Sequence, residues 1–311
     1  MDTSSGRELV AVGPAGAPSW MAEAVRAGGG RVVPAERAHA VLWADPDDPA
    51  GLRRLLDDHG DRIAWVQLPW AGIEPYVGVI DEERHWTCGK GVYAEPVAEM
   101  ALTLALAGMR GLGRYARSGR WREAGTIGTN LAGARVTVLG GGGITDELLQ
   151  LLAPFRCDVT VVRSRPTTMA GAARVVGPDE LDAALEERDL VVLALALTPH
   201  TRGVVDARRL RLLTPSTWLV NVARGAHVVT DDLVAALGAG TIGGAGLDVT
   251  DPEPLPDGHP LWSLPNCIIT PHVGNTPEMA RPLLAARITE NVARWIAGGP
   301  LLGPVDVALG Y

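Results

Sequence analysis

Short apolar runs alternate with amphipathic helical patterns along most of the 311-residue chain. The apolar runs predict strands over residues 8–12, 31–33, 40–43, 63–67, 135–139, 159–162, 190–195, 218–221, 245–248 and 267–270. The segments between them predict helices over residues 19–27, 49–59, 95–109, 179–187, 207–213, 230–239 and 277–297, with Ser19 as an expected N-cap. Apolar strands joined by helical crossovers form parallel sheets, so we expect an α/β fold with two doubly wound units. Residues 68–92 are turn-rich and mixed.

Composition excludes several classes of protein. The formal net charge is −8, and Lys90 is the only lysine, so binding to nucleic acid or to an anionic membrane is not expected. The longest apolar stretches, residues 100–109 and 190–197, are shorter than the ~20 residues of a transmembrane helix. Residues 1–8 lack the pattern of a signal peptide, so we expect a cytoplasmic protein. The three cysteines have no zinc-site spacing, so we expect reduced thiols and no metal.

A glycine-rich turn follows the strand predicted over residues 135–139. Gly140 and Gly142 match the first two glycines of the GxGxxG pattern, and Thr145 occupies the third position. The first glycine permits a tight turn, and the second lets the backbone approach a pyrophosphate at a helix N-terminus. In a strand–turn–helix context, this pattern favours a dinucleotide-binding site.

The end of the next strand indicates which dinucleotide binds. An acidic residue usually contacts the ribose 2′-hydroxyl of NAD at this place. Here the chain has Arg163, Ser164 and Arg165 instead. Two guanidinium groups and a hydroxyl suit a 2′-phosphate, so we expect NADP(H) to be preferred over NAD(H). The alternative is a solvated basic turn.

Three further segments, each directly after a predicted strand, carry candidate catalytic groups. They contain Arg224, Glu253 and His272. Open α/β sheets bind ligands at the carboxyl ends of their strands, so these side chains are expected at one edge. Arg224 can donate hydrogen bonds to an anionic ligand, and His272 can exchange a proton near neutral pH while paired with Glu253.

Taken together, these motifs closely resemble those of the D-isomer-specific 2-hydroxyacid dehydrogenase family. The resemblance also includes Val97-Ala98-Glu99, Gly119-Arg-Trp121, Leu197-Thr-Pro-His-Thr201 and the C-terminal Ile296-Ala-Gly-Gly-Pro-Leu. It covers nearly the whole chain, although Tyr93 stands where the family usually has Asn.

The resemblance implies the domain organisation. A flavodoxin-like substrate domain would comprise residues 1–94 and 276–311, and a Rossmann cofactor domain, residues 95–275, would be inserted into it. The active site would lie in the cleft, and the closure of the domains would exclude water. The family is usually dimeric, which implies a homodimer with the long helix and the arm of residues 111–121 at the interface.

The resemblance also implies the roles of individual residues. Arg224, Glu253 and His272 would be catalytic. The backbone of Trp70, Ala71 and Gly72 would bind the substrate carboxylate together with Arg224. The cofactor would contact the following residues: Gly140, Gly142, Gly143, Ile144, Arg163, Ser164, Arg165, Leu195, Ala196, Thr201, Val222, Ala223, Asp248, His272 and Gly274. From the sequence alone, a turn-forming role for Asp248 at a strand end is an equal alternative.

The predicted function is the NADPH-dependent reduction of a small 2-ketoacid, of the glyoxylate or hydroxypyruvate type, to a D-2-hydroxyacid. A phosphoglycerate- or phosphonate-type dehydrogenase is an alternative, with Arg62, Arg84 or Lys90 as candidate anchors for a second anionic group. Trp65, Trp70 and Trp86 are candidates for a pocket that takes a bulkier substrate, with packing in the core as the simpler interpretation. A cofactor-sensing, corepressor-like binding protein is an alternative of another class, and turnover of a 2-ketoacid would distinguish it.

Overall fold

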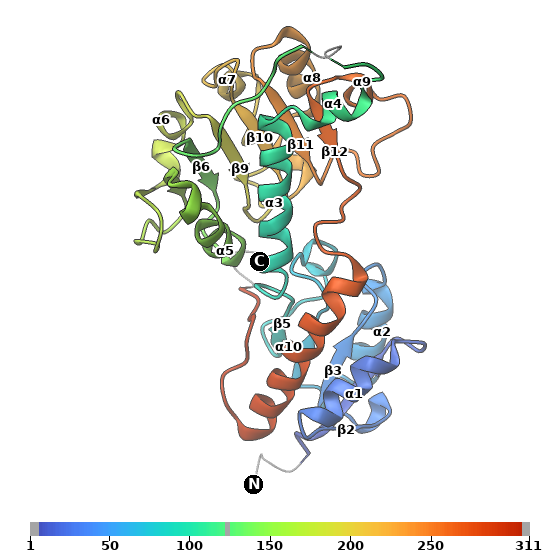
Figure 1. Cartoon of the computed structure of the whole chain (residues 1–311). Helices are drawn as coiled ribbons and strands as arrows, with labels where there is room; N and C mark the ends of the chain where they lie inside the picture. Colours follow the sequence, from blue (N-terminus) through green and yellow to red (C-terminus); the bar gives the residue numbers. More distant parts are fainter. Residues whose placement is uncertain (1–5, 122–124, 307–311) are drawn as a thin grey trace. The chain divides into compact units, whose positions relative to one another are not determined.

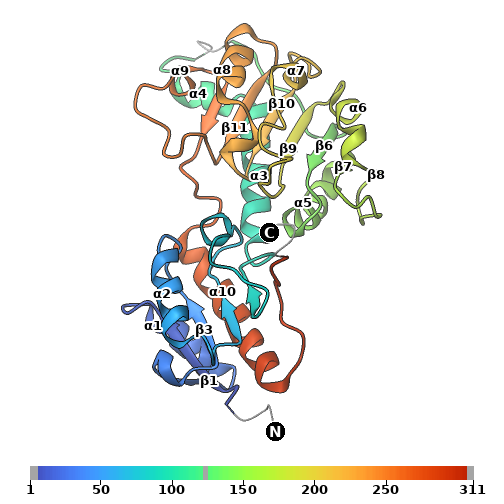
Figure 2. The same cartoon turned by 180° about the vertical axis from the view of Figure 1, so that it is seen from behind.

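The computed structural model describes residues 6–121 and 125–306. The chain divides into two compact units. Unit 1 comprises Met1–Tyr93 and Thr276–Tyr311, and unit 2 comprises Ala94–Asn275. Both are α/β units built on a parallel sheet, which confirms the predicted fold class (Figures 1 and 2).

Unit 1 is built on a five-stranded sheet in which every paired neighbour is parallel. The strand order is β2-β1-β3-β4-β5, the flavodoxin-like order of a doubly wound sheet. The strands are β1 Leu9–Gly13, β2 Arg31–Val32, β3 Ala40–Trp43, β4 Trp65–Gln67 and β5 His85–Thr87. The helices are α1 Ser19–Ala27, α2 Pro49–His59 and α10 Pro277–Ala297, with 3-10 turns η1 Ala35–Arg37 and η2 Glu74–Tyr76. Helices α1 and α10 pack side by side, so the last helix completes the unit that the first residues begin (Figure 1).

Unit 2 is built on a seven-stranded parallel sheet. Its order is β12-β11-β10-β9-β6-β7-β8, a Rossmann-type order in which the chain reverses its direction across the sheet between β6 and β9. The strands are β6 Arg135–Leu139, β7 Asp158–Val162, β8 Arg174–Val176, β9 Leu190–Leu193, β10 Trp218–Asn221, β11 Gly244–Leu247 and β12 Cys267–Ile269. The helices are α3 Ala94–Met109, α4 Leu112–Arg117, α5 Gly143–Leu152, α6 Leu181–Leu185, α7 Ala207–Leu210, α8 Thr230–Ala239 and α9 Pro260–Ser263, with turns η3 Ala153–Phe155, η4 Pro178–Glu180 and η5 Gly225–His227.

The central strands of unit 2 are buried on both faces. Leu139 and Val191 belong to a core cluster on one side of the sheet, while Val138 and Val192 belong to a cluster on the other side with α3 and α5. A helix layer therefore covers each face, which explains why these strands are apolar without alternation.

Several local predictions differ from the structure. Ser19 is the first residue of α1 and Pro18 is its N-cap, so the prediction of Ser19 as N-cap is wrong: its side chain forms no capping bond. Strands β5 and β8 and helix α4 were not predicted, because elements of three to six residues carry too little periodicity. Cys88, Cys157 and Cys267 are free thiols, and burial raises the pKa of Cys267 to about 12.

No helix within the described ranges combines the length and apolar character that a membrane crossing requires.

Candidate active site

The predicted catalytic and cofactor residues of unit 2 follow six neighbouring parallel strands. Gly140 follows β6, Arg163 follows β7 and Leu195 lies just beyond β9; Arg224 comes after β10, Asp248 after β11 and His272 after β12. Because all paired strands are parallel, their carboxyl ends meet at one edge of the sheet. The order of strands therefore gathers segments that are as far apart in the chain as Gly140 and His272, a separation of 272 − 140 = 132 residues.

His272 and Glu253 form a direct pair at this edge. The His272 Nδ1 lies 2.6 Å from the Glu253 Oε1, and both side chains are about half exposed, at 51% and 41%. A carboxylate only accepts hydrogen bonds, so Nδ1 carries the proton and Nε2 is the ring nitrogen that is left for a substrate. An oriented imidazole of this kind can act as a general acid or base.

Asp248 holds the backbone around His272. Its Oδ1 accepts from Thr270 Oγ1 (2.6 Å) and from the Val273 N–H (3.0 Å), and its Oδ2 accepts from the Gly274 N–H (2.8 Å). His272 has a φ of 53°, in the left-handed region that residues other than glycine rarely occupy. These bonds are those of a turn former, so the buried carboxylate stabilises an unfavourable backbone at the position predicted to be catalytic.

Gly225 brings the loop of Arg224 against the loop of Glu253. A Cβ atom at Gly225 would lie 1.9 Å from the carbonyl carbon and oxygen of Thr250, so no other residue fits without displacing that backbone. The Thr250 N–H in turn lies 3.4 Å from Glu253 Oε2. Arg224 is half-buried and donates one N–H of its guanidinium to the Ala223 carbonyl (2.8 Å).

The glycine turn after β6 has the geometry expected for a dinucleotide. Gly140 has a φ of +107°, and a Cβ atom there would lie 2.1 Å from the Ala194 carbonyl oxygen. Gly142 is the N-cap of α5, no side chain caps this helix, and a Cβ atom at Gly142 would meet nothing within 4 Å. Uncapped N–H groups at Gly143 and Ile144 beside open space fit a pyrophosphate. Thr145 is fully buried, and its hydroxyl donates to the Gly140 carbonyl (2.8 Å).

Arg163 lies over this turn. A Cβ atom at Gly141 would be 2.7 Å from Arg163 Cδ, so the side chain passes directly across the glycines. Arg163 is half-buried, whereas Ser164 and Arg165 are exposed. The cations stand at the end of β7, where the ribose of a dinucleotide is expected.

The remaining predicted cofactor residues lie in the loops after β9, β10 and β12. Thr201 Oγ1 accepts from the Thr198 N–H and donates to the Ala196 carbonyl, both at 2.8 Å, which closes the loop of residues 195–201. Val222 and Ala223 are buried, and Val222 donates its N–H to the Leu193 carbonyl.

His227 is a site feature that the sequence reasoning missed. It is fully buried, and its Nδ1 and Nε2 lie 3.0 and 3.1 Å from the carbonyl oxygens of Thr201 and Leu195. The imidazole therefore ties the loop of residues 195–201 to the turn that carries Arg224. Its position two residues after Arg224-Gly225 was the only signal in the sequence.

The predicted carboxylate-binding loop belongs to unit 1 and follows β4. Trp70 is 37% exposed, whereas Trp65 (0%) and Trp86 (4%) are core residues, so only one of the three candidate tryptophans is available to a ligand. A buried network supports the loop from below: Asn291 Nδ2 donates to Gln67 Oε1 (2.9 Å), which also accepts from Thr87 Oγ1 (2.9 Å). The sequence reasoning did not identify this network.

The three candidate anchors for a second anionic group are not equivalent. Arg62 and Arg84 precede β4 and β5, so they lie at the amino edge of the sheet, opposite the Trp70 loop. Arg84 also forms an ion pair with Asp81 and donates hydrogen bonds to the carbonyls of Ile63 and Gly60. Lys90 follows β5 and shares the carboxyl edge with Trp70.

Within the described ranges, no group of three or more His, Cys, Asp or Glu side chains could hold a metal ion.

Comparison with known proteins agrees with this geometry. The family model for the NAD-binding domain of D-isomer-specific 2-hydroxyacid dehydrogenases matches residues 100–274. An uncharacterized protein of Corynebacterium melassecola is 39% identical, over 93% of this chain and 95% of its own length. Glyoxylate/hydroxypyruvate reductase A of Serratia proteamaculans is 30% identical over 88% of this chain and 87% of its own.

A solved structure extends the comparison to both units. The D-isomer-specific 2-hydroxyacid dehydrogenase of Xanthobacter autotrophicus Py2, in complex with NADPH and MES, aligns over 97% of this chain and 99% of its own. The TM-score is 0.83 and the sequence identity is 29%. With the pairing of His272 and Glu253 at the carboxyl edge of a Rossmann-type sheet, these similarities lead to one conclusion: the chain belongs to the D-isomer-specific 2-hydroxyacid dehydrogenase family, as an NAD(P)-dependent enzyme.

Proposed function

We propose that this enzyme reduces a small 2-ketoacid, a class that includes glyoxylate and hydroxypyruvate, to the D-2-hydroxyacid with NADPH. The observation that carries the proposal is the 2.6 Å hydrogen bond between His272 and Glu253, at the sheet edge to which Arg224 also belongs. The named reductase of Serratia proteamaculans supports the substrate class, and the NADPH complex of the Xanthobacter enzyme supports the cofactor.

The proposed mechanism assigns one role to each group. When bound at the glycine turn, the nicotinamide cofactor would supply the hydride for the new C–H bond at the ketone carbon. In unit 2, Arg224 would bind the carboxylate and polarise the ketone. In unit 1, the N–H groups of Ala71 and Gly72 are the proposed ligands of a carboxylate. His272 Nε2 gives its proton to the developing alkoxide, and Glu253 stabilises the imidazolium that is present before transfer. In the oxidative direction His272 takes the proton back.

A panel of 2-ketoacids assayed with NADPH and with NADH tests the reaction. We expect cofactor oxidation with glyoxylate, hydroxypyruvate or a close homologue. His272→Ala should lower kcat by about 10²- to 10⁴-fold and leave the cofactor Kd nearly unchanged, because the side chain transfers a proton. Tight cofactor binding without turnover of any 2-ketoacid would instead favour a cofactor-sensing binding protein.

The preference for NADPH is tested separately. Arg163 crosses the glycine turn, and Arg165 follows it at the end of β7, where a 2′-phosphate would be bound. Each charge-assisted hydrogen bond contributes about 1.5–3 kcal/mol, roughly 10- to 100-fold in affinity. Replacing both arginines with alanine should therefore weaken NADPH binding and leave NADH binding almost unchanged. Equal affinities for the two cofactors in the unmodified enzyme would contradict this assignment.

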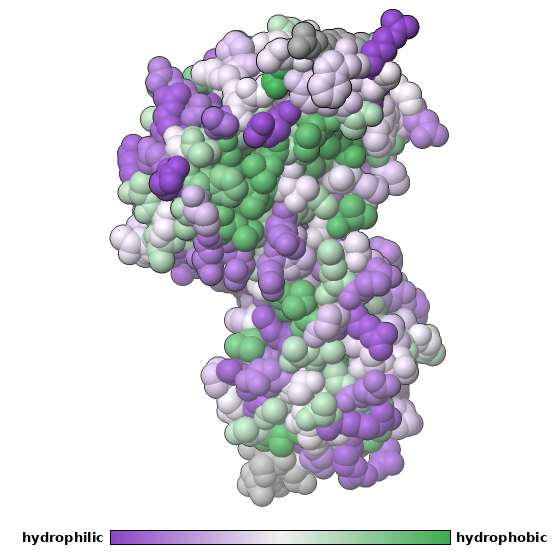
Figure 3. Space-filling model, viewed as in Figure 1, coloured by the Kyte–Doolittle hydropathy of each residue, from purple (hydrophilic) through white to green (hydrophobic). Residues whose placement is uncertain are grey.

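We also propose that two copies of the chain associate through unit 2. Leu112 (54%) and Tyr115 (38%) are exposed on α4, which contacts α3, and Trp121 (93%) is exposed shortly after α4. Leu102 and Leu106 of α3 are half-buried. Figure 3 shows hydrophobic residues gathered on the face where α3 lies in Figure 1. An apolar helix that one copy of the chain leaves partly uncovered is suited to an interface with a second copy.

A further inference from the structure

The indole of Trp70 is the largest apolar group that the carboxylate-binding loop presents to solvent. Trp70 is 37% exposed, although it stands directly after the buried Leu68 and the turn residue Pro69. Its position is adjacent to Ala71 and Gly72, whose N–H groups are the proposed ligands of the substrate carboxylate. Any 2-ketoacid held by those groups therefore lies beside the residue that carries this ring.

The ring is held in place by the next segment of unit 1. Tyr93 is buried, its hydroxyl donates to the Pro69 carbonyl (2.7 Å), and its ring packs against Trp70 with the centroids 5.6 Å apart at 52°. The Gly89 N–H donates to the Trp70 carbonyl (2.8 Å). A Cβ atom at Gly89 would lie 2.7 Å from the Pro69 carbonyl oxygen, so this contact requires glycine.

These contacts fix both ends of the Trp70 backbone and one face of its ring. A side chain that is immobilised before the ligand arrives loses little conformational entropy on binding, so its apolar contacts contribute fully to affinity. An indole that packs against a buried tyrosine and is 37% exposed is suited to contact with an apolar ligand group.

We propose that Trp70 contacts the side chain of the substrate and makes the enzyme selective for 2-ketoacids with a short apolar side chain. Tyr93 acts as a positioning residue for Trp70. This inference rests on the proposed function, and specifically on the role of the Trp70–Gly72 loop. It deepens that function by naming the substrate class: alkyl 2-ketoacids in preference to hydroxylated or phosphorylated ones.

A matched pair of substrates tests the selectivity. Hydroxypyruvate and 2-oxobutanoate are similar in size and differ by a hydroxyl in place of a methyl group. We expect kcat/KM to be higher for 2-oxobutanoate than for hydroxypyruvate, and to rise about fourfold per added carbon from glyoxylate through pyruvate to 2-oxobutanoate. A higher kcat/KM for hydroxypyruvate, or for 3-phosphohydroxypyruvate with Lys90 as its anchor, would overturn the proposal.

Variants at three positions identify the side chain responsible. Trp70→Ala should lower kcat/KM for 2-oxobutanoate by at least about tenfold, mostly through KM, and should lower that for glyoxylate by a clearly smaller factor, because glyoxylate has no side chain to contact. Trp70→Phe should keep most of the difference in kcat/KM between 2-oxobutanoate and glyoxylate. Tyr93→Phe, which keeps the ring but loses the bond to Pro69, should give a smaller loss with the same dependence on the substrate.

The control is Trp20→Ala, a partly buried tryptophan on α1 in the same unit, which should leave the order of substrates unchanged. Thermal melting of each variant reports whether it is folded, and the substrate-dependent loss expected for Tyr93→Phe serves as the test if Trp70→Ala is not folded. Equal losses for glyoxylate and 2-oxobutanoate in the Trp70 variants would refute the contact. The absence of turnover of every 2-ketoacid by the unmodified enzyme would refute the proposed function instead.

Discussion

At the scale of single residues, the site depends on backbone positions as much as on catalytic side chains. Asp248 is buried and accepts hydrogen bonds from three donors of the segment around His272. The left-handed backbone of His272 persists only because the surrounding structure stabilises it. Asp248 therefore has the turn-forming role that the sequence offered as an alternative, because it fixes the backbone around His272. Its contact with the nicotinamide stays a prediction.

Asp248→Asn should impair both activity and stability. The amide group cannot accept at both atoms, so one of the backbone N–H donors loses its partner, which destabilises the fold by about 1–3 kcal/mol. We expect kcat to fall at least about tenfold as His272 moves, measured by steady-state kinetics together with urea unfolding. Asp257→Asn, at an exposed position in the same connection, should stay within about 0.5 kcal/mol of the parent. Unchanged kcat in Asp248→Asn would show that the turn does not position His272.

Substitution of Gly140 should impair folding, whereas substitution of Gly142 should impair cofactor binding. Gly140→Ala places a Cβ atom 2.1 Å from the Ala194 carbonyl oxygen at a φ of +107°, so it should destabilise unit 2 by more than about 2 kcal/mol. Gly142→Ala meets no protein atom, so its melting temperature should change little, while NADPH binding weakens because the methyl group occupies the approach of the pyrophosphate. Melting curves and fluorescence titration measure the two effects. Similar behaviour of the two variants would contradict the distinction.

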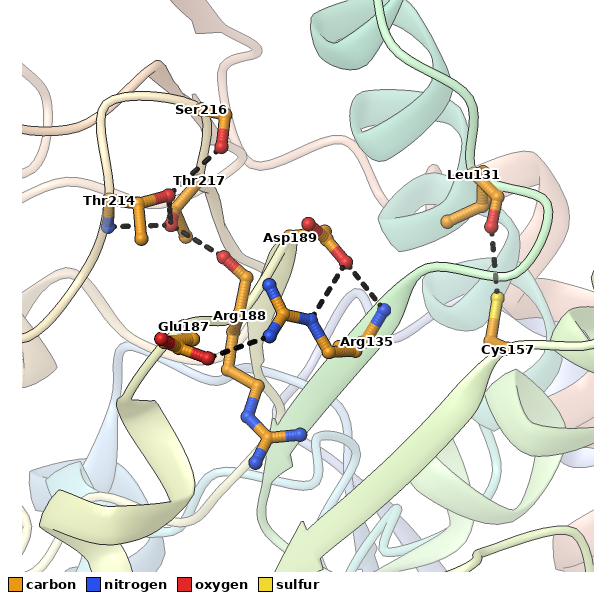
Figure 4. A network of polar contacts seen from close by, with 9 residues as sticks. All are labelled: Leu131, Arg135, Cys157, Glu187, Arg188, Asp189, Thr214, Ser216 and Thr217. Carbon is orange, nitrogen blue, oxygen red and sulfur yellow. Dashed lines mark hydrogen bonds and ion pairs between the residues drawn. The ribbon is translucent and has the colours of Figure 1, made fainter.

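At the scale of secondary-structure elements, the two edges of the unit 2 sheet have different roles: one carries the candidate site and the other a structural polar network. The carboxyl edge carries the candidate site, and the amino edge carries a network of polar contacts that organises the strand starts (Figure 4). Asp189, before β9, accepts from the Arg135 N–H at the start of β6 (2.7 Å). Thr217 Oγ1, before β10, donates to the Arg188 carbonyl (2.6 Å). These bonds satisfy polar groups where the strands begin.

Asp189→Ala should therefore affect stability without affecting catalysis. Loss of the acceptor for the Arg135 N–H should lower the free energy of unfolding by about 1 kcal/mol, since one hydrogen bond contributes about that much. We expect kcat and KM to stay within about twofold, because the change lies at the opposite edge from His272. Glu187→Ala, which removes a carboxylate that is 79% exposed, is the matched control and should have a smaller effect. A large loss of kcat would contradict the separation of the two edges.

The ion pairs of Asp182 on α6 with Arg208 and Arg209 on α7 should stabilise the fold less at low pH. Hydrogen bonds from Arg208 and Arg209 lower the pKa of Asp182 from 3.8 to about 2. Because the pKa is lowered by folding, the stabilisation is present above pH 4 and is lost as the pH falls toward 2. Asp182→Asn should cost less than about 1 kcal/mol at pH 7, since the pair is exposed to solvent, and the difference from the parent should shrink below pH 4. Urea unfolding at pH 7 and pH 3 measures it, and a difference that grows in acid would be inconsistent with this origin.

At the scale of the whole molecule, the proposed dimer rests on the partly exposed apolar residues of α3 and α4. Sedimentation equilibrium should report a dimer of the 32.7 kDa chain. Leu112→Glu introduces a charge at a position that is 54% exposed in one copy, so it should dissociate the dimer without unfolding unit 2. Val77→Glu, at a 57% exposed residue of unit 1, should leave the dimer intact. A monomeric parent, or a Leu112→Glu variant that remains dimeric, would rule out this interface.

The sequence alone determined the fold class, most strands and long helices, and the three catalytic candidates. Buried parallel strands are apolar on both faces, and the bounds of α2 (Pro49–His59) and α10 (Pro277–Ala297) are those that their periodicity and terminal residues predict. Arg224, Glu253 and His272 could be found because each follows a strand, and parallel strands end at one edge.

Only the tertiary structure decided what those residues touch. The pairing of His272 with Glu253 is already predicted from the sequence. The three donors on Asp248 and the position of His227 beside two carbonyl oxygens are contacts between segments that are many residues apart, and no local pattern encodes them. The same holds for Gly225, because the backbone of Thr250 occupies the space that a side chain at position 225 would need. Periodicity reports which face of an element is buried, whereas the partner across the interface depends on how the strands are ordered in the sheet.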